Sequence, residues 1–459
     1  MIHSYKLFGY NIILDIASGS IHIVDDAAFD AITLFASLSE NEHAVAEKIN
    51  VKHPKLSEND ISELISEIKS LKAQGKLFTP DTFSAAAENR KMPSFKAMCF
   101  NVSHLCNMTC VYCFAEKGEY GGSGELMPLE TGKRAIDFLC GNSEGRRNLD
   151  IDFFGGEPLL NWEAVKEIVL YANSKQRQYS KNFRFTLTTN GLGINDDVID
   201  FTNKYMHNIV LSLDGRAEIN DLHRKLPNGK GSYTEVLPKI KKLVESRRAM
   251  GYYIRGTYTK ENLDFTSDIF HLADLGFKEL SLEPVVAKKE EPYALDMSDL
   301  EKISQQYEIL CNEMIRRKIQ GRGFNFYHFN LDLINSPCVH KRIAGCGVGT
   351  EYLAVSPDGS LYPCHQFVGD DKFKMGDVWS GIDSRKQKFA GVFSGANIYT
   401  RPECKDCWAR LYCSGGCAAN AYSDTGNIYG VYQLGCEMFK KRIECAIVLK
   451  AVELTQSNR

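Results

Sequence analysis

The chain lacks long hydrophobic runs. No stretch of about 18 apolar residues occurs in its 459 residues, so the sequence predicts no membrane-spanning helix. Residues 1–6 contain no basic region followed by an apolar core, so no signal peptide is evident. A net charge of only −3 gives no strong attraction to nucleic acid or anionic lipid. These absences argue against membrane and nucleic-acid partners.

The fifteen cysteines do not form a small disulfide scaffold, because the chain is long and no secretion signal is evident. Hydrophobic residues at 44% and charged residues at 25% are ordinary for globular proteins. The length suggests roughly three domains. We therefore predict a cytoplasmic protein that uses its thiols to hold metal.

Three of these cysteines, Cys106, Cys110 and Cys113, lie in one short segment with the spacing C-x3-C-x2-C. The segment follows an apolar run and reads as a loop. Three thiolates can hold three irons of a cubane cluster, and with no fourth cysteine nearby one iron stays open and reactive. A structural zinc site is the alternative, although zinc usually takes four ligands with repeated C-x2-C pairs.

The middle of the chain alternates apolar runs with amphipathic stretches of helical period. The run before Cys106 is followed by runs at 149–154, 183–188, 208–213, 252–258 and 279–286. Such alternation predicts strand–helix units and a parallel sheet. Six units are too few for a closed eight-stranded barrel, so we expect an open, partial barrel with its site at the carboxyl ends of the strands.

Polar motifs fall at those strand ends. Gly155-Gly156-Glu157-Pro158 offers glycines that allow close approach of a ligand and a carboxylate that can pair with an ammonium group. Asn190 and Ser212 end the next two strands, and Arg224 follows. For these last three residues, turn-capping or surface roles are the alternative.

Together the cysteine segment and these motifs resemble the radical SAM superfamily. The resemblance implies that Cys106, Cys110 and Cys113 hold a catalytic [4Fe-4S] cluster whose free iron chelates S-adenosylmethionine. It further implies cofactor contacts: Tyr112 bordering the adenine, Gly155, Gly156 and Glu157 holding the methionine amino group, and Asn190, Ser212 and Arg224 near the ribose and carboxylate.

The last third of the chain has the spacing C-x12-G-x4-C, C-x2-C-x5-C-x3-C, C. This spacing resembles the SPASM extension of radical SAM enzymes, which implies two auxiliary [4Fe-4S] clusters. By position, Cys346, Cys364 and Cys417 hold the first, and Cys404, Cys407, Cys413 and Cys436 hold the second. The first set is one ligand short, and either Cys338 or a substrate thiolate could complete it. A zinc ribbon is the alternative for this region.

The sequence pattern of residues 1–90 predicts three strands followed by three helices, which would form a winged-helix-like module. Eight Lys/Arg against thirteen Asp/Glu give it a net charge of −5, which argues against binding DNA. The module resembles the peptide-recognition domain (RRE) of ribosomal-peptide modifying enzymes, akin to the small chaperone of quinone-cofactor biosynthesis. There a leader peptide adds a strand to the sheet edge. A purely structural cap is the alternative.

The expected fold is therefore α/β, with three parts. A leader-recognition domain spans 1–90, a partial (β/α)6 radical SAM barrel spans 96–310, and a SPASM iron–sulfur domain spans 311–459. Residues 80–95 read as a polar linker between the first two.

The whole chain resembles the SCIFF maturases, or ranthipeptide synthases. This implies a radical SAM enzyme that forms thioether cross-links between cysteine sulfur and carbon in a cysteine-rich precursor peptide, with a reductant such as flavodoxin or ferredoxin. Sulfatase-maturating relatives carry an Asp after the cysteine that corresponds to Cys364, where this chain has His365. Formylglycine formation, carbon–carbon cross-linking and a non-catalytic electron-transfer protein remain alternatives.

Overall fold

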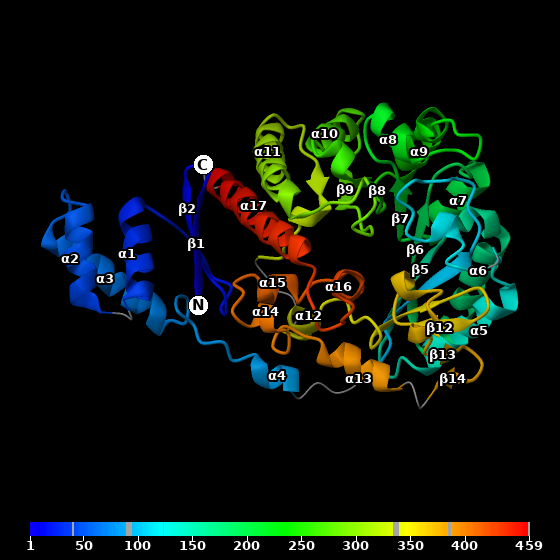
Figure 1. The fold of residues 1–459 in the computed structure, drawn as a ribbon, viewed down its shortest axis with the longest axis horizontal. Helices are drawn as coiled ribbons and strands as arrows, with labels where there is room; N and C mark the ends of the chain where they lie inside the picture. The colour runs from blue at the N-terminus through cyan, green and yellow to red at the C-terminus, as the bar shows by residue number, and fades with distance from the viewer. Residues whose placement is uncertain (39–40, 89–93, 123, 334–338, 384–386, 458–459) are drawn as a thin grey trace.

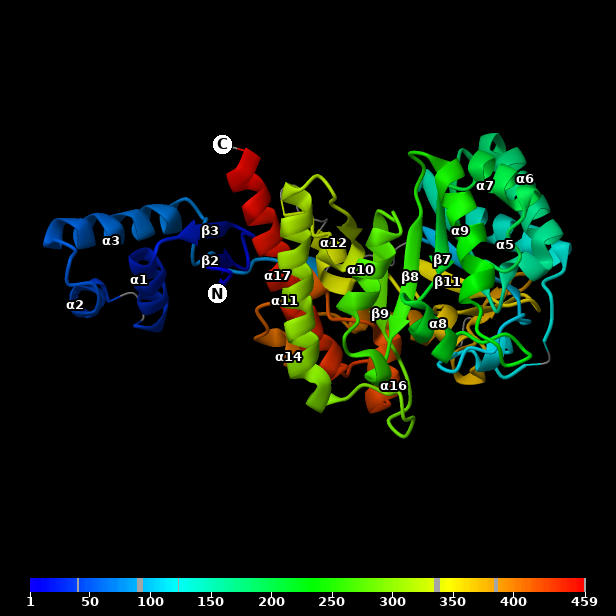
Figure 2. The same cartoon turned by 90° about the horizontal axis from the view of Figure 1, so that it is seen from above.

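The computed structural model describes residues 1–459 except 39–40, 89–93, 123, 334–338, 384–386 and 458–459. The linker prediction falls partly on 89–93 and the alternative ligand Cys338 falls on 334–338, so both lie outside the described residues. Figures 1 and 2 show an elongated molecule, with the N-terminal helices at one end and a large sheet with its helices at the other. No helix in the described ranges is long and apolar enough to cross a membrane.

Three antiparallel strands and three helices form the N-terminal module, as predicted. The strands β1 (Ile2–Leu7), β2 (Tyr10–Asp15) and β3 (Ile21–Val24) pair in that order. The helices are α1 (Asp26–Ser37), α2 (Glu42–Lys52) and α3 (Glu58–Ala73). Asp25 and Ser57 cap α1 and α3 through their side chains. Buried aliphatic side chains of the three helices pack on Ile13 of β2, so this module has a core of its own.

The central sheet contains the six predicted parallel strands. They are β4 (Ala97–Ser103), β5 (Asn148–Gly155), β6 (Asn182–Thr189), β7 (Asn208–Ser212), β8 (Tyr253–Tyr258) and β9 (Glu279–Pro284). Each pairs in parallel with the next. A short seventh strand, β10 (Asn325–Phe326), pairs in parallel with β9 and extends the expected six units.

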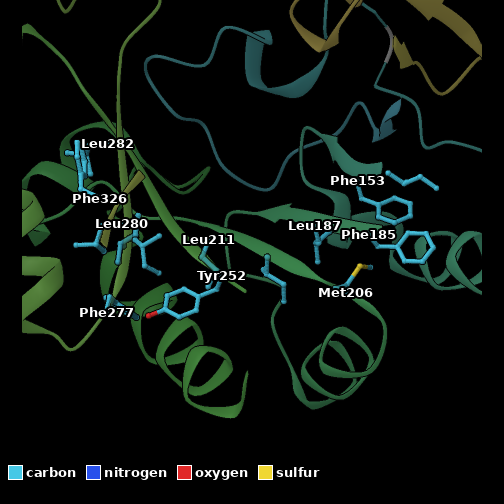
Figure 3. Packing of buried hydrophobic residues seen from close by; sticks show 14 of the residues in the cluster. Phe153, Phe185, Leu187, Met206, Leu211, Tyr252, Phe277, Leu280, Leu282 and Phe326 are labelled. Carbon is cyan, nitrogen blue, oxygen red and sulfur yellow. The ribbon is translucent and has the colours of Figure 1, made fainter. Parts of the chain in front are cut away.

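Alternate strand residues point to a helical layer. The buried side chains Phe153, Phe185, Leu187, Leu211 and Leu280 lie on one face of successive strands (Figure 3). The helices that follow the strands are α5 (Leu129–Gly141), α6 (Trp162–Tyr179), α7 (Asp196–Tyr205), α8 (Ala217–His223), α9 (Tyr233–Arg247), α10 (Thr266–Asp274) and α11 (Leu300–Ile319). The intervening strand residues are more polar, so the face away from this helical layer is the hydrophilic one.

The C-terminal region adds four strands to the same sheet, which the sequence did not predict. β11 (Tyr352–Val355) pairs in parallel with β4, and β12 (Ser360–Tyr362), β13 (Gly376–Asp377) and β14 (Gly381–Ile382) follow in antiparallel order. The sheet therefore has eleven strands within the described residues. This pairing attaches the segment between Cys346 and Cys364 to β4, the first of the parallel strands.

Helices complete the C-terminal region and contact both other parts. They are α12 (Val339–Ala344), α13 (Gln387–Gly395), α14 (Pro402–Lys405), α15 (Arg410–Cys413), α16 (Ala418–Thr425) and α17 (Gln433–Ser457). The short helix α4 (Ser84–Glu88) lies in the connector after the N-terminal module. Strand β1 packs on α17, where His3 lies 3.0 Å from Glu444 and the Tyr5 hydroxyl donates to the Glu444 carbonyl (3.0 Å; Figure 1). The N-terminal module is thus anchored on the C-terminal region.

Candidate active site

The loop that follows β4 presents Cys106, Cys110 and Cys113. Backbone hydrogen bonds hold it in place, because Thr109 N donates to the Lys225 carbonyl (2.8 Å) and Val111 N to the His223 carbonyl (2.9 Å). The three thiols lie close enough to influence one another electrostatically. Burial raises the pKa of the Cys106 thiol to about 12, with smaller contributions from Glu157 and the other two thiols. Binding to a cationic metal centre would favour the ionised form of the Cys106 thiol.

A cavity of about 240 Å³ lies beside this loop at the carboxyl ends of strands β5 to β9. Every cofactor contact predicted from the sequence lines it: Tyr112, Gly155, Gly156, Glu157, Asn190, Ser212 and Arg224. The three cysteines line it as well. The structure thus gathers all the predicted residues of the first site in one place.

The two glycines of the Gly155-Gly156 pair allow close packing against the cysteine loop. A Cβ on Gly155 would lie 2.3 Å from the Ser103 carbonyl oxygen, and one on Gly156 would lie 2.2 Å from that of Leu105. Gly155 also has a φ of +128°, a backbone conformation that residues with a side chain rarely adopt. The sequence analysis assigned these glycines to close approach of a ligand. In the structure, the atoms nearest to an added Cβ are backbone atoms of the cysteine loop, so the glycines allow this loop to pack closely.

Glu157 is fully buried at the floor of this site. Its carboxylate accepts hydrogen bonds from the Thr189 hydroxyl (2.7 Å), Asn190 N (2.8 Å) and Leu159 N (3.0 Å). Burial raises the pKa of Glu157, and these donors oppose the rise. The carboxylate is therefore fixed in position before any cofactor binds.

Asn190 joins the end of β6 to the cysteine loop. Its side-chain amide donates to Asn107 Oδ1 (2.8 Å) and lies 3.8 Å from Cys106 Sγ, while its oxygen accepts from Leu192 N (3.0 Å). Ser212 lies at the end of β7, in register with Arg255 of β8. The contacts of the Asn190 side chain thus hold the cysteine loop against the end of β6.

Asp214 is a site residue that the sequence analysis did not select. The Tyr112 hydroxyl donates to its carboxylate (2.6 Å), and Arg224 donates in turn to the Tyr112 oxygen (3.1 Å). Burial raises the pKa of Asp214, and Arg224 and Tyr112 oppose this. The Nε atom of Arg224 is buried without a hydrogen-bond partner. Asp214 comes two residues after Ser212, just beyond the end of a predicted strand, and this position was the available signal.

Two further charged residues, Arg255 and Glu283, line the cavity from β8 and β9 and were also not predicted. The Arg255 guanidinium lies 3.7 Å from Glu283, and His328 Nε2 lies 3.0 Å from the same carboxylate. No motif marked them, because they are single residues on strands whose spacing is set only by the folded sheet. The side of the cavity formed by β8 and β9 therefore presents one positive and one negative side chain.

The C-terminal cysteines fall into two groups in the structure. Cys364 is electrostatically coupled to Cys417 and Cys346, and Cys413 to Cys436, Cys404 and Cys407. Burial raises the pKa of both Cys364 and Cys413 to about 12. Cys346 and Cys417 are exposed, whereas the second group is buried or half-buried. The same two sets of cysteines were expected from the resemblance to the SPASM extension, and the first set is the more accessible.

Among the residues that the structure describes, no three His, Cys, Asp or Glu side chains converge on one point that could hold a metal ion. A cubane cluster distributes its thiolates over separate irons, so its ligands need not meet at one point. The donors are also all sulfur, which suits iron–sulfur clusters. The four cysteines without a motif, Cys99, Cys140, Cys311 and Cys445, are buried as predicted.

His365 and Gln366 bring the first C-terminal group to the cavity. Both line it, and they directly follow Cys364. The His365 ring packs near the rings of Phe154 and Phe114, with centroids 5.1 and 6.1 Å away. Gln366 Nε2 lies 3.9 Å from Cys417 Sγ. One cavity is therefore lined both by the three cysteines of the loop after β4 and by the two residues that follow Cys364.

The central part of the sequence matches a known family. Residues 100–266 match the model of the radical SAM superfamily. An uncharacterised protein of Methanocaldococcus jannaschii is 31% identical over 216 residues, which cover 46% of this chain and 69% of that protein. The chain belongs to the radical SAM superfamily. A cysteine-type anaerobic sulfatase-maturating enzyme of Clostridium novyi is 28% identical over 77% of this chain and 95% of its own length.

Solved radical SAM structures share the fold. The structure of anSMEcpe with bound AdoMet superposes with a TM-score of 0.65 at 21% identity, covering 80% of this chain and all of that one. Streptococcus suis SuiB bound to S-adenosylmethionine superposes with a TM-score of 0.52 at 15% identity and covers 95% of this chain. The radical SAM α/β fold with its large sheet is therefore established for this protein.

Replacing Gly156 with alanine should destabilise the protein and disturb the cysteine loop. The added Cβ meets the backbone of Leu105, which cannot swing away as a side chain can. We expect a loss of about 1–3 kcal/mol, the usual effect of overpacking, and a clear fall in cofactor cleavage. Thermal unfolding under anaerobic conditions measures the first effect and 5'-deoxyadenosine formation the second.

Gly141→Ala is the matched control for this substitution. Gly141 ends α5 with nothing within 4 Å of an added Cβ. We expect its thermal midpoint to be unchanged or slightly higher, since alanine restricts the unfolded chain. Equal behaviour of the two variants would contradict the packing role of Gly156.

Proposed function

We propose that the chain is a peptide maturase that forms thioether cross-links between cysteine sulfur and carbon in a cysteine-rich, ribosomally made precursor peptide, as SCIFF maturases do. The observation that supports this best is the shared border of the cavity. Cys106, Cys110 and Cys113 line it, and so do His365 and Gln366, the neighbours of Cys364. A substrate thiolate at the accessible C-terminal group would stand beside the carbon that loses hydrogen.

In this proposal the cofactors are S-adenosylmethionine and three [4Fe-4S] clusters. When bound, the catalytic cluster and cofactor supply a 5'-deoxyadenosyl radical. The protein contributes position: Glu157 offers a fixed carboxylate to the methionine amino group, and Asp214 holds Tyr112 where it borders the adenine. Phe114 and Phe154 narrow the cavity and exclude water and competing hydrogen donors.

The proposed domains follow the sequence prediction. Residues 1–90 recognise a leader peptide, 96–310 form the radical SAM barrel, and 311–459 form the SPASM domain. The three-stranded order β1-β2-β3 leaves β3 as an edge strand, which supports leader binding by strand addition. The remaining partner is a reductant such as flavodoxin or ferredoxin, and the proposed location is the cytoplasm.

Sulfatase maturation is the second candidate. The Clostridium novyi relative, named as a cysteine-type anaerobic sulfatase-maturating enzyme, aligns over 95% of its own length. Against this candidate, the chain has His365 where the resemblance to that family predicts an aspartate. The extra N-terminal module also favours a substrate with a leader, because the precursor peptide SuiA is bound in the SuiB structure that covers 94% of this chain.

The deciding experiment searches the open reading frames beside this gene for a short cysteine-rich peptide and assays that peptide as the substrate. Thioether formation should remove two hydrogens per bridge and leave the cysteine unreactive toward thiol-alkylating reagents. Formylglycine would instead yield an aldehyde that reacts with hydrazines, and a carbon–carbon link would leave the thiols free. Absence of any cofactor cleavage under strictly anaerobic conditions would favour a non-catalytic electron-transfer protein.

Leader binding should depend on the edge of β3. We expect Ile23→Glu to leave the fold intact, because this side chain is 43% exposed, but to weaken leader binding about tenfold or more. Ile23→Pro should abolish strand addition by removing a backbone donor. Fluorescence anisotropy with a labelled leader measures binding, and circular dichroism checks the fold. Full binding by a folded proline variant would make the module a structural cap.

A further inference from the structure

Arg401 is a buried cation of the C-terminal region. Its side chain is 2% exposed. Its guanidinium donates only to backbone carbonyls, those of Gly415 and Ile428 (3.0 Å for Ile428), and its Nε has no partner. No carboxylate of the described residues forms an ion pair with it. An uncompensated buried charge is strongly destabilising, so an anion is expected nearby.

The surroundings of Arg401 are the two C-terminal cysteine groups. Arg401 lines a cavity of about 20 Å³ together with Cys346 and Gly416. The Arg401 carbonyl also accepts a hydrogen bond from Cys404 N (3.1 Å). Thiolate ligands of iron–sulfur clusters are the anions that these surroundings can supply.

Arg401 also holds the segment that joins the two groups. Ser414, Gly415 and Gly416 connect Cys413 to Cys417, and all three have positive φ values (59°, 87° and 75°). Arg401 binds the Gly415 carbonyl, and a Cβ on Gly415 would lie 3.1 Å from its Nη1. The arginine thus supports a turn whose ends belong to different cysteine groups.

We propose that Arg401 is the shared counter-cation of two auxiliary iron–sulfur clusters, placed to favour their reduction. This inference rests on the proposed function, which assigns Cys346, Cys364 and Cys417 to one cluster and Cys404, Cys407, Cys413 and Cys436 to the other. Each cluster with its thiolates is anionic, and reduction adds a further negative charge. A buried cation close to their thiolates stabilises the reduced form, because net charge and burial set cluster potentials.

Arg410 provides a matched control. It is also buried, at 8% exposed, it lies in the same segment, and its Nε is likewise without a partner. Unlike Arg401, it is paired with a carboxylate, Asp81, at 2.9 Å. Its charge is therefore already balanced within the protein, and its loss should affect the clusters less.

The test is a potentiometric titration of the full-length chain, reconstituted anaerobically and followed by electron paramagnetic resonance. A Cys106→Ala, Cys110→Ala, Cys113→Ala background leaves only the auxiliary signals. In Arg401→Gln we expect the equilibrium constant for one-electron reduction to fall at least tenfold, which is 59 mV toward negative potential. Arg401→Lys, which keeps the charge, and Arg410→Gln should each shift it by less than half of that.

The outcomes separate the inference from the function on which it rests. In the triple-alanine background, about eight irons per chain support two auxiliary clusters, and about four would refute that assignment. With eight irons retained, an unshifted Arg401→Gln overturns the role of Arg401. If the Arg401→Gln variant binds no iron, the Arg401→Lys variant is used in its place. Full iron content and an unchanged reduction potential in Arg401→Lys would support the charge role of Arg401. Loss of iron from Arg401→Lys would contradict it.

Discussion

Replacing Cys106, Cys110 and Cys113 together with alanine should abolish reductive cleavage of S-adenosylmethionine and lower the iron content from about twelve to about eight per chain. All three thiols line the 240 Å³ cavity and act on one another electrostatically. Alanine offers no thiolate, so the open iron that would chelate the cofactor is lost. Chromatography of 5'-deoxyadenosine and iron analysis after anaerobic reconstitution measure the two effects.

The control for this experiment is Cys140→Ala. Cys140 lies on α5 at 5% exposure and belongs to no cysteine motif. We expect its iron content and cleavage rate to match those of the parent. If cleavage survives in the triple variant, the active site has been misplaced, however well the fold agrees with radical SAM structures.

The strands were predictable because each carries its own pattern. In β5, for example, Leu149, Ile151 and Phe153 are buried toward the helices, and polar residues alternate with them. The motifs at the strand ends were then brought together by one general rule of parallel sheets, that their carboxyl ends share an edge. Local pattern and general topology were therefore enough to gather the first site.

Contacts between distant segments were not predictable in this way. Strand β11 pairs with β4 across some 250 residues, and its four residues carry no distinctive signal. Arg255 and Glu283 line the folded cavity but belong to no sequence motif. Their roles depend on the register of neighbouring strands, which a single sequence does not reveal.

The anchoring of the N-terminal module was also hidden, and it changes how the module can be tested. Leu7, Ile12 and Leu14 belong to the main hydrophobic core, and the His3 ring stacks on Trp408 with centroids 3.7 Å apart. Trp408 directly follows Cys407. Deleting residues 1–90 would therefore expose core surface and disturb a cysteine group, so substitutions on β3 test leader binding more cleanly.

Replacing Cys346, Cys364 and Cys417 with alanine should abolish peptide cross-linking while sparing cofactor cleavage. This group is the more accessible of the two C-terminal cysteine groups. His365 and Gln366, which follow Cys364, line the cavity. The substrate thiolate would lose its binding place, whereas the loop with Cys106 keeps its own contacts. We expect about four irons fewer per chain and no loss of two hydrogens from the peptide, measured by iron analysis and mass spectrometry.

Cys99→Ala is the appropriate control. Cys99 is buried in the same cluster as Cys364, yet it belongs to no cysteine motif. It should retain full iron content and cross-linking. Cofactor cleavage should continue in the triple variant, with 5'-deoxyadenosine formed uncoupled from peptide modification. Cross-linking at the parental rate in that variant would contradict the proposed site for the substrate thiolate, since the thiol would then react without this cysteine group.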